Sequence, residues 1–235
     1  MPVDAAIASN LQSVRSRIDA AARRAGRDPS QVRLIAVSKT FPVDAIREAF
    51  AAGQREFGEN KVQEGLQKIT ETTELSIKWH LLGHLQRNKI RKAIAFHAVH
   101  SIDSVELLQK LEETALAADL RPELFVQVDL AGEAGKFGAA PDEVRRVLDA
   151  ADRCRAARVV GLMIIPPVPD APEDARPWFR QLRELRDGWV ASGVPPHLLR
   201  ELSMGMSGDF EVAIQEGATI VRVGTAIFGS RHVQH

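Results

Sequence analysis

Short apolar runs rich in Val, Ile and Leu recur along this chain of 235 residues, separated by stretches long enough for helices. Continuous apolar runs predict strands that are covered on both faces, and helices between them predict parallel strands joined by crossovers. We predict strands near residues 33–38, 55–58, 78–83, 98–102, 123–129, 158–165, 199–204 and 219–223. We predict helices near residues 42–52, 60–70, 86–95, 104–118, 141–156, 172–191 and 207–216.

Eight strands that alternate with helices predict an α/β fold, a closed (β/α)8 barrel of the TIM type. A doubly wound open sheet is the alternative, but no G-x-G-x-x-G pattern follows the first strand. An extra N-terminal helix is expected before Gly26, because apolar residues recur three and four positions apart: Ile7, Leu11, Val14 and Ile18.

The chain contains no low-complexity linker, so we expect a single domain over residues 1–235. Within it, residues 1–30 would hold the N-terminal helix, residues 31–231 the barrel and residues 232–235 a tail. The proline-rich segment 166–172 is too short to separate domains and predicts a rigid loop after the sixth strand.

Two local signals mark expected helix starts. Pro42 and Pro141 fit first-turn positions, where the missing backbone N–H breaks no helical hydrogen bond. Asp103 and Glu106 are spaced as a capping pair for the helix near 104–118.

Charge and apolar patterning exclude several partners. The 31 Lys and Arg residues balance the 31 Asp and Glu residues, so nothing favours nucleic acid or a charged membrane surface. No run of 18 or more apolar residues predicts a membrane span, and the charged N-terminus lacks the apolar core of a signal peptide. The single cysteine, Cys154, fits a reducing environment, so we expect the protein in the cytoplasm. We expect a monomer, because no exposed apolar heptad is present.

Lys39 stands directly after the first predicted strand, at the end of the barrel where active sites form. An apolar environment favours loss of the ammonium proton, and the neutral amine can form a Schiff base with an aldehyde. A strand-end lysine that reaches into solvent is the alternative interpretation.

Two segments of small residues follow the seventh and eighth strands, at 203–209 and 221–225. Small residues let the backbone approach an anion, hydroxyl groups and helix N-terminal amides donate hydrogen bonds to it, and barrels often bind phosphate with these loops. Tight turns that need glycine are the alternative explanation. Together with Lys39 the pattern predicts a ligand that carries a phosphate group and reacts with an amine.

A phosphate near a reactive lysine leaves two ligand classes, pyridoxal 5′-phosphate (PLP) and a sugar phosphate in an aldolase-like reaction. Arg222 bears on the choice, because an inward-facing arginine needs an acceptor and a pyridine nitrogen supplies one. Such a donor would weaken the ring as an electron sink. An aldolase would need a carboxylate beside Lys39, for which Asp129 and Glu59 are candidates by position only.

The chain resembles the pyridoxal phosphate homeostasis proteins, small PLP-binding proteins related to the N-terminal barrel of alanine racemase. Ala36-Val37-Ser38-Lys39-Thr40 carries part of the resemblance, and longer matching segments follow it in order at 57–64, 79–89, 161–163, 202–209 and 221–229. Because these segments are spread over most of the chain with the family's spacing, a chance likeness is very improbable.

The resemblance implies PLP held as a Schiff base on Lys39 and released to apo-enzymes, with no catalysis of its own. It implies cofactor-binding roles for Asn60, His84, Met163, Ser203, Gly205, Ser207, Arg222, Gly224 and Thr225. Among these, the serines, Gly224 and Thr225 would contact the phosphate, Arg222 would lie near the pyridine nitrogen, and Asn60 and Met163 would line the ring. Gln86 would border the pocket beside His84.

An amino-acid racemase is the alternative function. Racemisation needs a base on each face of the substrate carbanion, and Lys39 could serve one face. In alanine racemase the opposite base is a tyrosine supplied by a second, β-rich domain of the partner subunit. This chain contains no tyrosine and ends about six residues beyond Gly229, which argues against that activity.

Two further features carry less weight. His80 and His84 are four residues apart, but they lie at a strand end and lack the glutamate of a zinc-protease motif, so we expect no metal site. Lys136 lies where the family often has Lys-x-Gly, and its role is open, with a solvated loop charge as the default interpretation.

Overall fold

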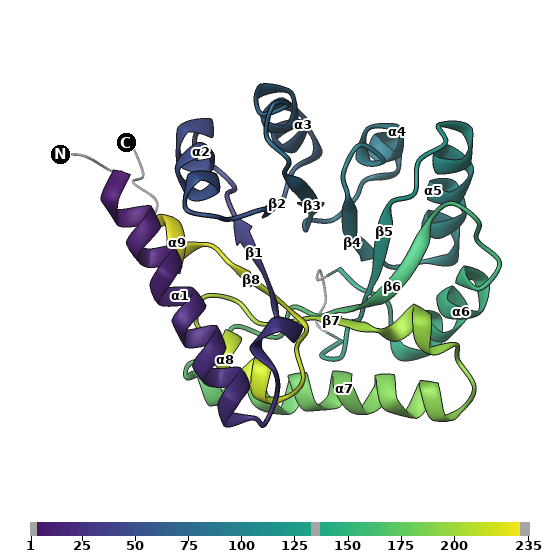
Figure 1. The fold of residues 1–235 in the computed structure, drawn as a ribbon. Coiled ribbons are helices and arrows are strands. Elements are labelled where there is room, and N and C mark those ends of the chain that lie inside the picture. The colour runs from purple at the N-terminus through teal and green to yellow at the C-terminus, as the bar shows by residue number, and fades with distance from the viewer. Residues whose placement is uncertain (1–3, 133–136, 231–235) are drawn as a thin grey trace.

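The computed structural model describes residues 4–132 and 137–230, and its eight parallel strands close into a barrel in the order β1 to β8 (Figure 1). The predicted fold is therefore confirmed. The strands are Arg33–Val37 (β1), Glu56–Glu59 (β2), Lys78–Leu81 (β3), Ala98–Ile102 (β4), Glu123–Gln127 (β5), Arg158–Met163 (β6), Glu201–Ser203 (β7) and Ile220–Val223 (β8). Lys136 and the tail 232–235 lie outside the described residues.

Helices alternate with these strands on the outside of the barrel. The α-helices are Asp4–Arg24 (α1), Val43–Ala51 (α2), Val62–Glu71 (α3), Ile90–Ala93 (α4), Val105–Ala117 (α5), Pro141–Ala151 (α6), Arg176–Ala191 (α7), Phe210–Gln215 (α8) and Thr225–Phe228 (α9). Short 3-10 turns lie at Pro29–Gln31 (η1), Arg87–Lys89 (η2), Pro172–Ala175 (η3) and Pro196–Leu199 (η4).

The sequence placed each strand and missed some helix details. The short helix α9 was not expected, because its four residues are too few for a periodic apolar pattern. The expected capping pair Asp103 and Glu106 is wrong: Ser104 is the N-cap of α5, and its hydroxyl accepts a hydrogen bond from the Leu107 N–H at 3.3 Å. Pro141 occupies the first turn of α6 as predicted, whereas Pro42 caps α2 from outside.

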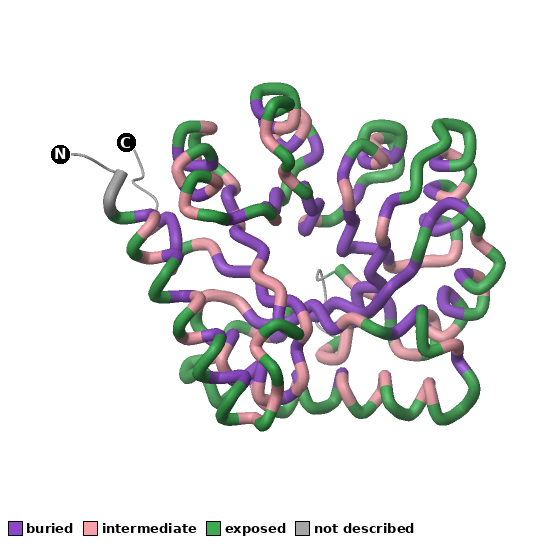
Figure 2. The backbone as a smooth tube through the Cα atoms, viewed as in Figure 1, coloured by how far each residue is buried: buried purple, intermediate pink, exposed green. Residues whose placement is uncertain are grey.

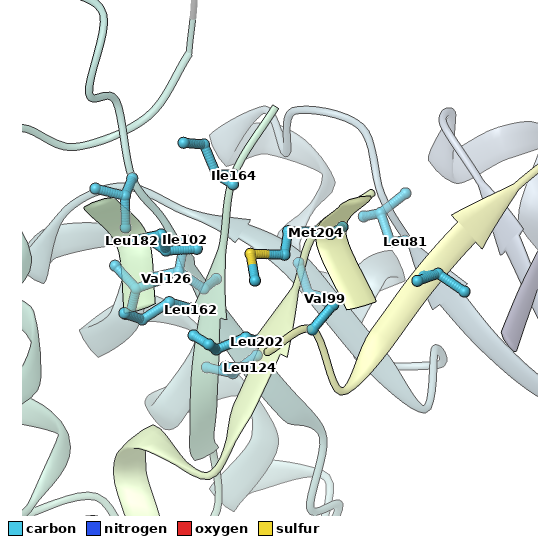
Figure 3. Close-up of a cluster of buried hydrophobic side chains, with 14 of the residues drawn as sticks. Leu81, Val99, Ile102, Leu124, Val126, Leu162, Ile164, Leu182, Leu202 and Met204 are labelled. Atoms are coloured by element: carbon cyan, nitrogen blue, oxygen red, sulfur yellow. The ribbon is translucent and has the colours of Figure 1, made fainter. Parts of the chain in front are cut away.

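Most of the hydrophobic core lies between the strands and the surrounding helices. Figure 2 shows buried residues along the strands and exposed residues on the outer faces of the helices. Figure 3 shows part of this layer, in which Leu124 and Leu162 from neighbouring strands pack near Leu202 of β7. A smaller apolar cluster fills the middle of the barrel: Ile35, Leu82, Ala98, Phe125, Val160, Met163 and Ile220.

The extra N-terminal helix is confirmed as α1, which lies against α2, α8 and α9 on the outside of the barrel (Figure 1). The apolar stripe recognised in the sequence is the face that it buries, at Ile7, Leu11, Val14 and Ile18. Asn10 adds a polar contact, donating its side-chain N–H to the Ile227 carbonyl at 3.0 Å. The chain turns back into the barrel after Gly26, whose φ of 68° favours glycine.

Charged side chains fill the amino end of the barrel and pair with one another. Arg33 lies 3.6 Å from Glu56 (Nη1–Oε2) and 3.3 Å from Glu201 (Nη2–Oε1). Arg158 lies 3.3 Å from Glu123 (Nη2–Oε1). A cationic group therefore faces each of these three carboxylates.

Within the part of the chain that the structure describes, no helix combines the length and the apolar character needed to cross a bilayer.

Candidate functional site

A cavity of about 520 Å³ opens at the carboxyl end of the barrel. Residues at or beyond the ends of most strands line it: Val37, Lys39, Asn60, Leu82, Gly83, His84, Gln127, Phe137, Ile165, Met206, Ser207, Gly208, Arg222, Gly224 and Thr225. Lys39 and Arg222 bring positive charge, and no Asp or Glu is among the described residues that line the cavity. This combination suits an anionic ligand.

A larger hollow of about 880 Å³ lies outside the barrel, between α4 and α5. Its charges include both signs and pair with each other, Arg87 with Glu106 at 2.6 Å and Lys110 with Glu113 at 3.0 Å. No strand end contributes to it, so the cavity at the carboxyl end of the barrel is the better candidate for a site.

Lys39 is partly exposed and lies in the loop between β1 and α2, whose backbone is strained. The next residue, Thr40, has a φ of 69°, in the left-handed region that few non-glycine residues adopt. Glu64 accepts a hydrogen bond from the Thr40 N–H at 2.6 Å, and Ser38 donates its hydroxyl to Glu59 Oε1 at 2.7 Å. Contacts on both sides of Lys39 therefore fix its backbone.

Buried Lys68 on α3 completes this arrangement. Its Nζ donates to the Ser38 carbonyl at 2.9 Å and to Glu59 Oε1 and Glu64 Oε1 at 2.8 Å each. Burial raises the pKa of Glu59, although the hydrogen bonds from Lys68 and Ser38 oppose the change. Burial acts on Glu64 in the same direction, but the hydrogen bonds from Lys68 and the Thr40 N–H outweigh it and lower the pKa of Glu64.

The turn after β7 depends on Gly205. Its φ is 95°, and an added Cβ would lie 2.6 Å from the Ala213 Cβ and 2.9 Å from the Phe210 Cα, so a side chain does not fit. Asp209 closes the turn by accepting a hydrogen bond from the Met206 N–H at 2.6 Å. Burial raises the pKa of Asp209, and this hydrogen bond opposes the change.

Ser207 connects the turn after β7 with the turn after β8. Its Oγ accepts hydrogen bonds from the N–H groups of Gly224 at 3.2 Å and Ala226 at 3.4 Å. A hydroxyl has two acceptor positions and one proton, so the proton of Ser207 is left for a group in the cavity. Thr225, which also lines the cavity, adds a second hydroxyl.

Arg222 on β8 is 4% exposed and reaches the cavity from inside the barrel. Its Nη1 donates to Ser203 Oγ and its Nη2 to the Ile164 carbonyl, each at 2.9 Å. Burial lowers the pKa of Arg222 to about 10, although the charge of Asp209 opposes the change, so the group is a cation at neutral pH.

Most of the expected site residues do meet at this cavity: Lys39, Asn60, His84, Ser207, Arg222, Gly224 and Thr225 all line it. Asn60 and His84 are exposed at its mouth. The His84 ring stacks on Phe137 with 3.8 Å between ring centroids, and its Nδ1 lies 3.7 Å from Asp103 Oδ2.

Four expected residues are not among those that line the cavity. Met163 is fully buried in the apolar cluster inside the barrel. Ser203 is fully buried as well, and its hydroxyl meets Arg222 and His100 instead of the cavity, one layer of side chains deeper than we expected. Gly205 shapes the turn that carries Ser207, and Gln86, exposed at the start of η2, is also outside the lining.

Sequence reasoning missed several lining residues. Gln127 is a polar residue at the end of an apolar strand, and that position was a usable signal. Its Nε2 donates to the Phe137 carbonyl at 2.8 Å and thereby ties the next loop to the cavity. Phe137 and Ile165 are 54% and 43% exposed, and no local pattern separates such loop residues from ordinary surface.

Comparison with known proteins shows which family the chain is similar to. The profile of the alanine racemase N-terminal domain matches residues 9–232. The pyridoxal phosphate homeostasis protein of Pseudomonas aeruginosa is 45% identical over 227 residues, which cover 96% of this chain and 96% of that protein. The protein of the same description from Aquifex aeolicus is 41% identical over 224 residues, covering 94% and 96%.

A solved structure shows the same fold at similar identity. PipY of Synechococcus elongatus, determined with PLP bound, is 42% identical and superposes with a TM-score of 0.84. The superposition covers 95% of this chain and 100% of that one.

Proposed function

We infer that this chain, which belongs to the alanine racemase N-terminal domain family and within it to the pyridoxal phosphate homeostasis proteins, binds PLP and serves PLP homeostasis. The observation that carries this inference is the cavity at the carboxyl end of the barrel. It brings an amine, a guanidinium and hydroxyl groups together, with no carboxylate among the described lining residues.

The residues present fit the chemistry of PLP, which has an aldehyde, a phosphate and a ring nitrogen that accepts a hydrogen bond. A cavity of about 520 Å³ is in the range of small-ligand pockets. Glycines at 205 and 224 keep side chains away from the turns around Ser207, and its hydroxyl proton is available to an anion. Sugar phosphates share the phosphate, but an aldolase-like reaction on them needs a carboxylate beside Lys39, and none is among the described residues that line the cavity.

Several of the lining residues then have a role. PLP supplies an aldehyde that condenses reversibly with a primary amine, and Lys39 would provide that amine. Ser207, Gly224 and Thr225 would hold the phosphate, and Arg222 would face the ring nitrogen. At the mouth, Asn60 and His84 would border the ring, as would the stacked Phe137.

We propose further that the protein stores PLP and delivers it to apo-enzymes without catalysing a reaction, as a cytoplasmic monomer. The composition supports this: the chain contains no tyrosine to act as a second base opposite Lys39. The names of the relatives describe homeostasis rather than a reaction.

The first test is an absorbance spectrum of the PLP-treated protein from about 300 to 500 nm, before and after borohydride, with peptide mapping of the reduced product. We expect a band that collapses on reduction, with the label on Lys39. Lys39→Ala should lose the label and keep the fold, and Lys78→Ala, at the amino end of the barrel, should keep both. Equal labelling of Lys39→Ala would reject Lys39 as the attachment site.

Delivery needs its own measurement. PLP-loaded protein is mixed with an apo-enzyme in the presence of a trap that consumes free PLP. Recovery of activity despite the trap would support direct transfer, and recovery abolished by the trap would leave a passive store. Racemase and aldolase assays on the same preparation test the proposed lack of catalysis.

A further inference from the structure

A row of polar side chains runs through the interior of the barrel, from Arg222 at the cavity toward the amino end. Arg222 Nη1 lies 2.9 Å from Ser203 Oγ, and Ser203 Oγ lies 3.0 Å from His100 Nδ1. His100 Nε2 lies 3.0 Å from His80 Nδ1, and His80 Nε2 lies 3.3 Å from Glu56 Oε2. The row therefore joins the cavity to the charged groups at the opposite end.

The chemistry of Arg222 permits one continuous direction for these hydrogen bonds. A guanidinium only donates, so Ser203 Oγ accepts from it and has one lone pair and one proton left for His100 Nδ1. If the hydroxyl donates that proton, Nδ1 of His100 is the bare ring nitrogen. A neutral imidazole that accepts at Nδ1 carries its proton on Nε2, so His100 donates to His80 Nδ1. By the same rule His80 carries its proton on Nε2, on the side that faces Glu56 Oε2 at 3.3 Å.

The Glu56 end selects this direction. His80 Nε2 and Glu56 Oε2 are both buried, form no well-aligned hydrogen bond with any described residue, and approach each other at 3.3 Å. If the two rings carried their protons on Nδ1, a bare nitrogen of His80 would face a carboxylate oxygen at 3.3 Å. Two buried acceptors that face each other are costly, so the Glu56 end favours the arrangement in which both rings carry their protons on Nε2.

The surroundings keep both rings neutral and in place. His80, His100 and Ser203 are fully buried. Burial, followed by the charge of neighbouring groups, lowers the pKa of His100 well below its ordinary value, and burial also lowers the pKa of His80. The His100 ring stacks on Phe125 with 4.0 Å between centroids and 15° between planes, which fixes its orientation.

We propose that His100 and His80 are positioning residues for Arg222, forming with Ser203 and Glu56 a one-directional hydrogen-bond chain that aims the guanidinium at the ring nitrogen of the cofactor. No carboxylate forms a hydrogen bond or ion pair with Arg222 among the described residues. Besides the more distant charge of Asp209, oriented dipoles stabilise its positive charge, and every acceptor in the hydrogen-bond chain faces it. The inference takes the identity of the ligand from the proposed function. The hydrogen-bond chain itself does not depend on that function.

The direction of the chain can be read without a cofactor. Long-range proton–nitrogen correlation spectra of the unmodified, ligand-free protein, labelled with nitrogen-15 in histidine, report which ring nitrogen carries the proton. We expect His80 and His100 to carry it on Nε2 at neutral pH. A proton on Nδ1 of either ring, or two protons on one ring, would overturn the proposal.

The effect on the cofactor is tested with matched substitutions. His100→Phe keeps an aromatic ring beside Phe125 and removes both ring nitrogens. His97→Phe makes the same change in a half-buried histidine that touches His80 edge-on at 5.7 Å but takes no part in the chain. We expect His100→Phe to weaken PLP binding about tenfold and His97→Phe to change it by less than about twofold.

A PLP analogue with carbon in place of the ring nitrogen separates positioning from general damage. If the chain acts through Arg222, His100→Phe should leave affinity for this analogue within about twofold of the unmodified protein. An equal loss for PLP and analogue would reject the proposal while leaving PLP binding intact. If the unmodified protein bound neither compound, the proposed function would be rejected instead. The histidine spectra would still test the hydrogen-bond chain. Should His100→Phe not fold, Ser203→Ala cuts the same chain one step nearer Arg222.

Discussion

The two ends of the barrel arrange their charges in opposite ways. At the amino end, Glu56, Glu123 and Glu201 each face a cationic group within 4 Å: Arg33 serves Glu56 and Glu201, and Arg158 serves Glu123. At the carboxyl end, the described lining of the cavity contains Lys39 and Arg222 and no carboxylate. One end is electrostatically complete within the protein, and the other suits an anion supplied from outside.

This difference separates residues that stabilise the barrel from residues that bind a ligand. Backbone strain does not follow this division, because Thr40 with a φ of 69° lies at the carboxyl end and Asp119 with a φ of 51° lies in the loop before β5, at the amino end. Strained backbone persists where surrounding contacts hold it, as those of Lys68 do for the Lys39 loop. The hydrogen-bond chain through His80 and His100 connects the two ends of the barrel. A change at one end can therefore affect the other.

The largest expected effect comes from removing the ammonium group under the Lys39 loop. Lys68→Met leaves buried Glu59 without its cation, and breaking a buried pair in this way costs about 3 to 5 kcal/mol. We expect urea unfolding to show that loss. Arg33→Met, which removes a partly exposed cation from the amino end, should cost only about 1 kcal/mol.

A second substitution sharpens the comparison. Adding Glu59→Gln to Lys68→Met removes the uncompensated charge and should restore part of the stability. Equal costs for Lys68→Met and Arg33→Met would show that the ion pairs at the two ends do not differ in depth, contrary to our interpretation.

The next effect concerns the turn that carries Ser207. Gly205→Ala forces an unfavourable φ and places a Cβ 2.6 Å from Ala213, so we expect a loss of about 2 to 4 kcal/mol in the free energy of unfolding. Gly208→Ala is the matched control, because an added Cβ there meets nothing within 4 Å. Its effect should stay within about 0.5 kcal/mol. Similar losses from both substitutions would mean that the turn tolerates side chains equally at the two positions.

Much of the fold was predictable because it is set by local patterns. Each apolar run became a strand, and the stripe from Ile7 to Ile18 became the buried face of α1. Lys39, Arg222 and the small-residue segments were recognisable, since each stands at the end of a predicted strand. Side chains that end parallel strands of a closed barrel must meet at one end.

The depth of each side chain was not predictable from the pattern. Ser203 and Ser207 are both small polar residues in one segment, yet one lies among the inner layers of the barrel and the other lines the cavity. Which layer a residue joins depends on strand stagger and register, which appear only when the barrel closes. The role of Lys68 was hidden for the same reason, because Ser38 follows β1 and Glu59 ends β2, whereas Lys68 lies on α3.

Acid should destabilise the folded protein through His80 and His100, the residues that connect the two ends of the barrel. The pKa values of His80 and His100 are lowered in the folded protein by burial first, so below about pH 6.5 the unfolded chain binds protons that the folded protein refuses. Stability should therefore fall as the pH drops below that value, by up to about 1.4 kcal/mol per pH unit for each histidine. Urea unfolding between about pH 7.5 and about pH 5.5 measures the slope.

Two variants assign this slope. His100→Phe should remove the share of one histidine, whereas His197→Ala, at an exposed position in η4, should leave the slope unchanged. The pKa of Glu56 is lowered, because hydrogen bonding to His80 and nearby cations outweigh the effect of burial. The contribution of the Glu56 carboxylate to stability is therefore lost only in more acidic solution, below the pH range of this experiment. A flat stability profile between the two pH values would contradict neutral, buried imidazoles.

The smallest effect tests whether the carboxyl end accepts an anion before any covalent chemistry. Inorganic phosphate at ten times its dissociation constant should raise the free energy of unfolding by about 1.4 kcal/mol, because it binds the folded protein alone. Thr225→Val removes one lining hydroxyl at nearly constant volume and should weaken this stabilisation, whereas Arg33→Met should not change it. Loss of the effect in Arg33→Met with no change in Thr225→Val would place the anion at the amino end. The contrast between a self-neutralised end and an anion-binding end would then be wrong, even if PLP still reacted with Lys39.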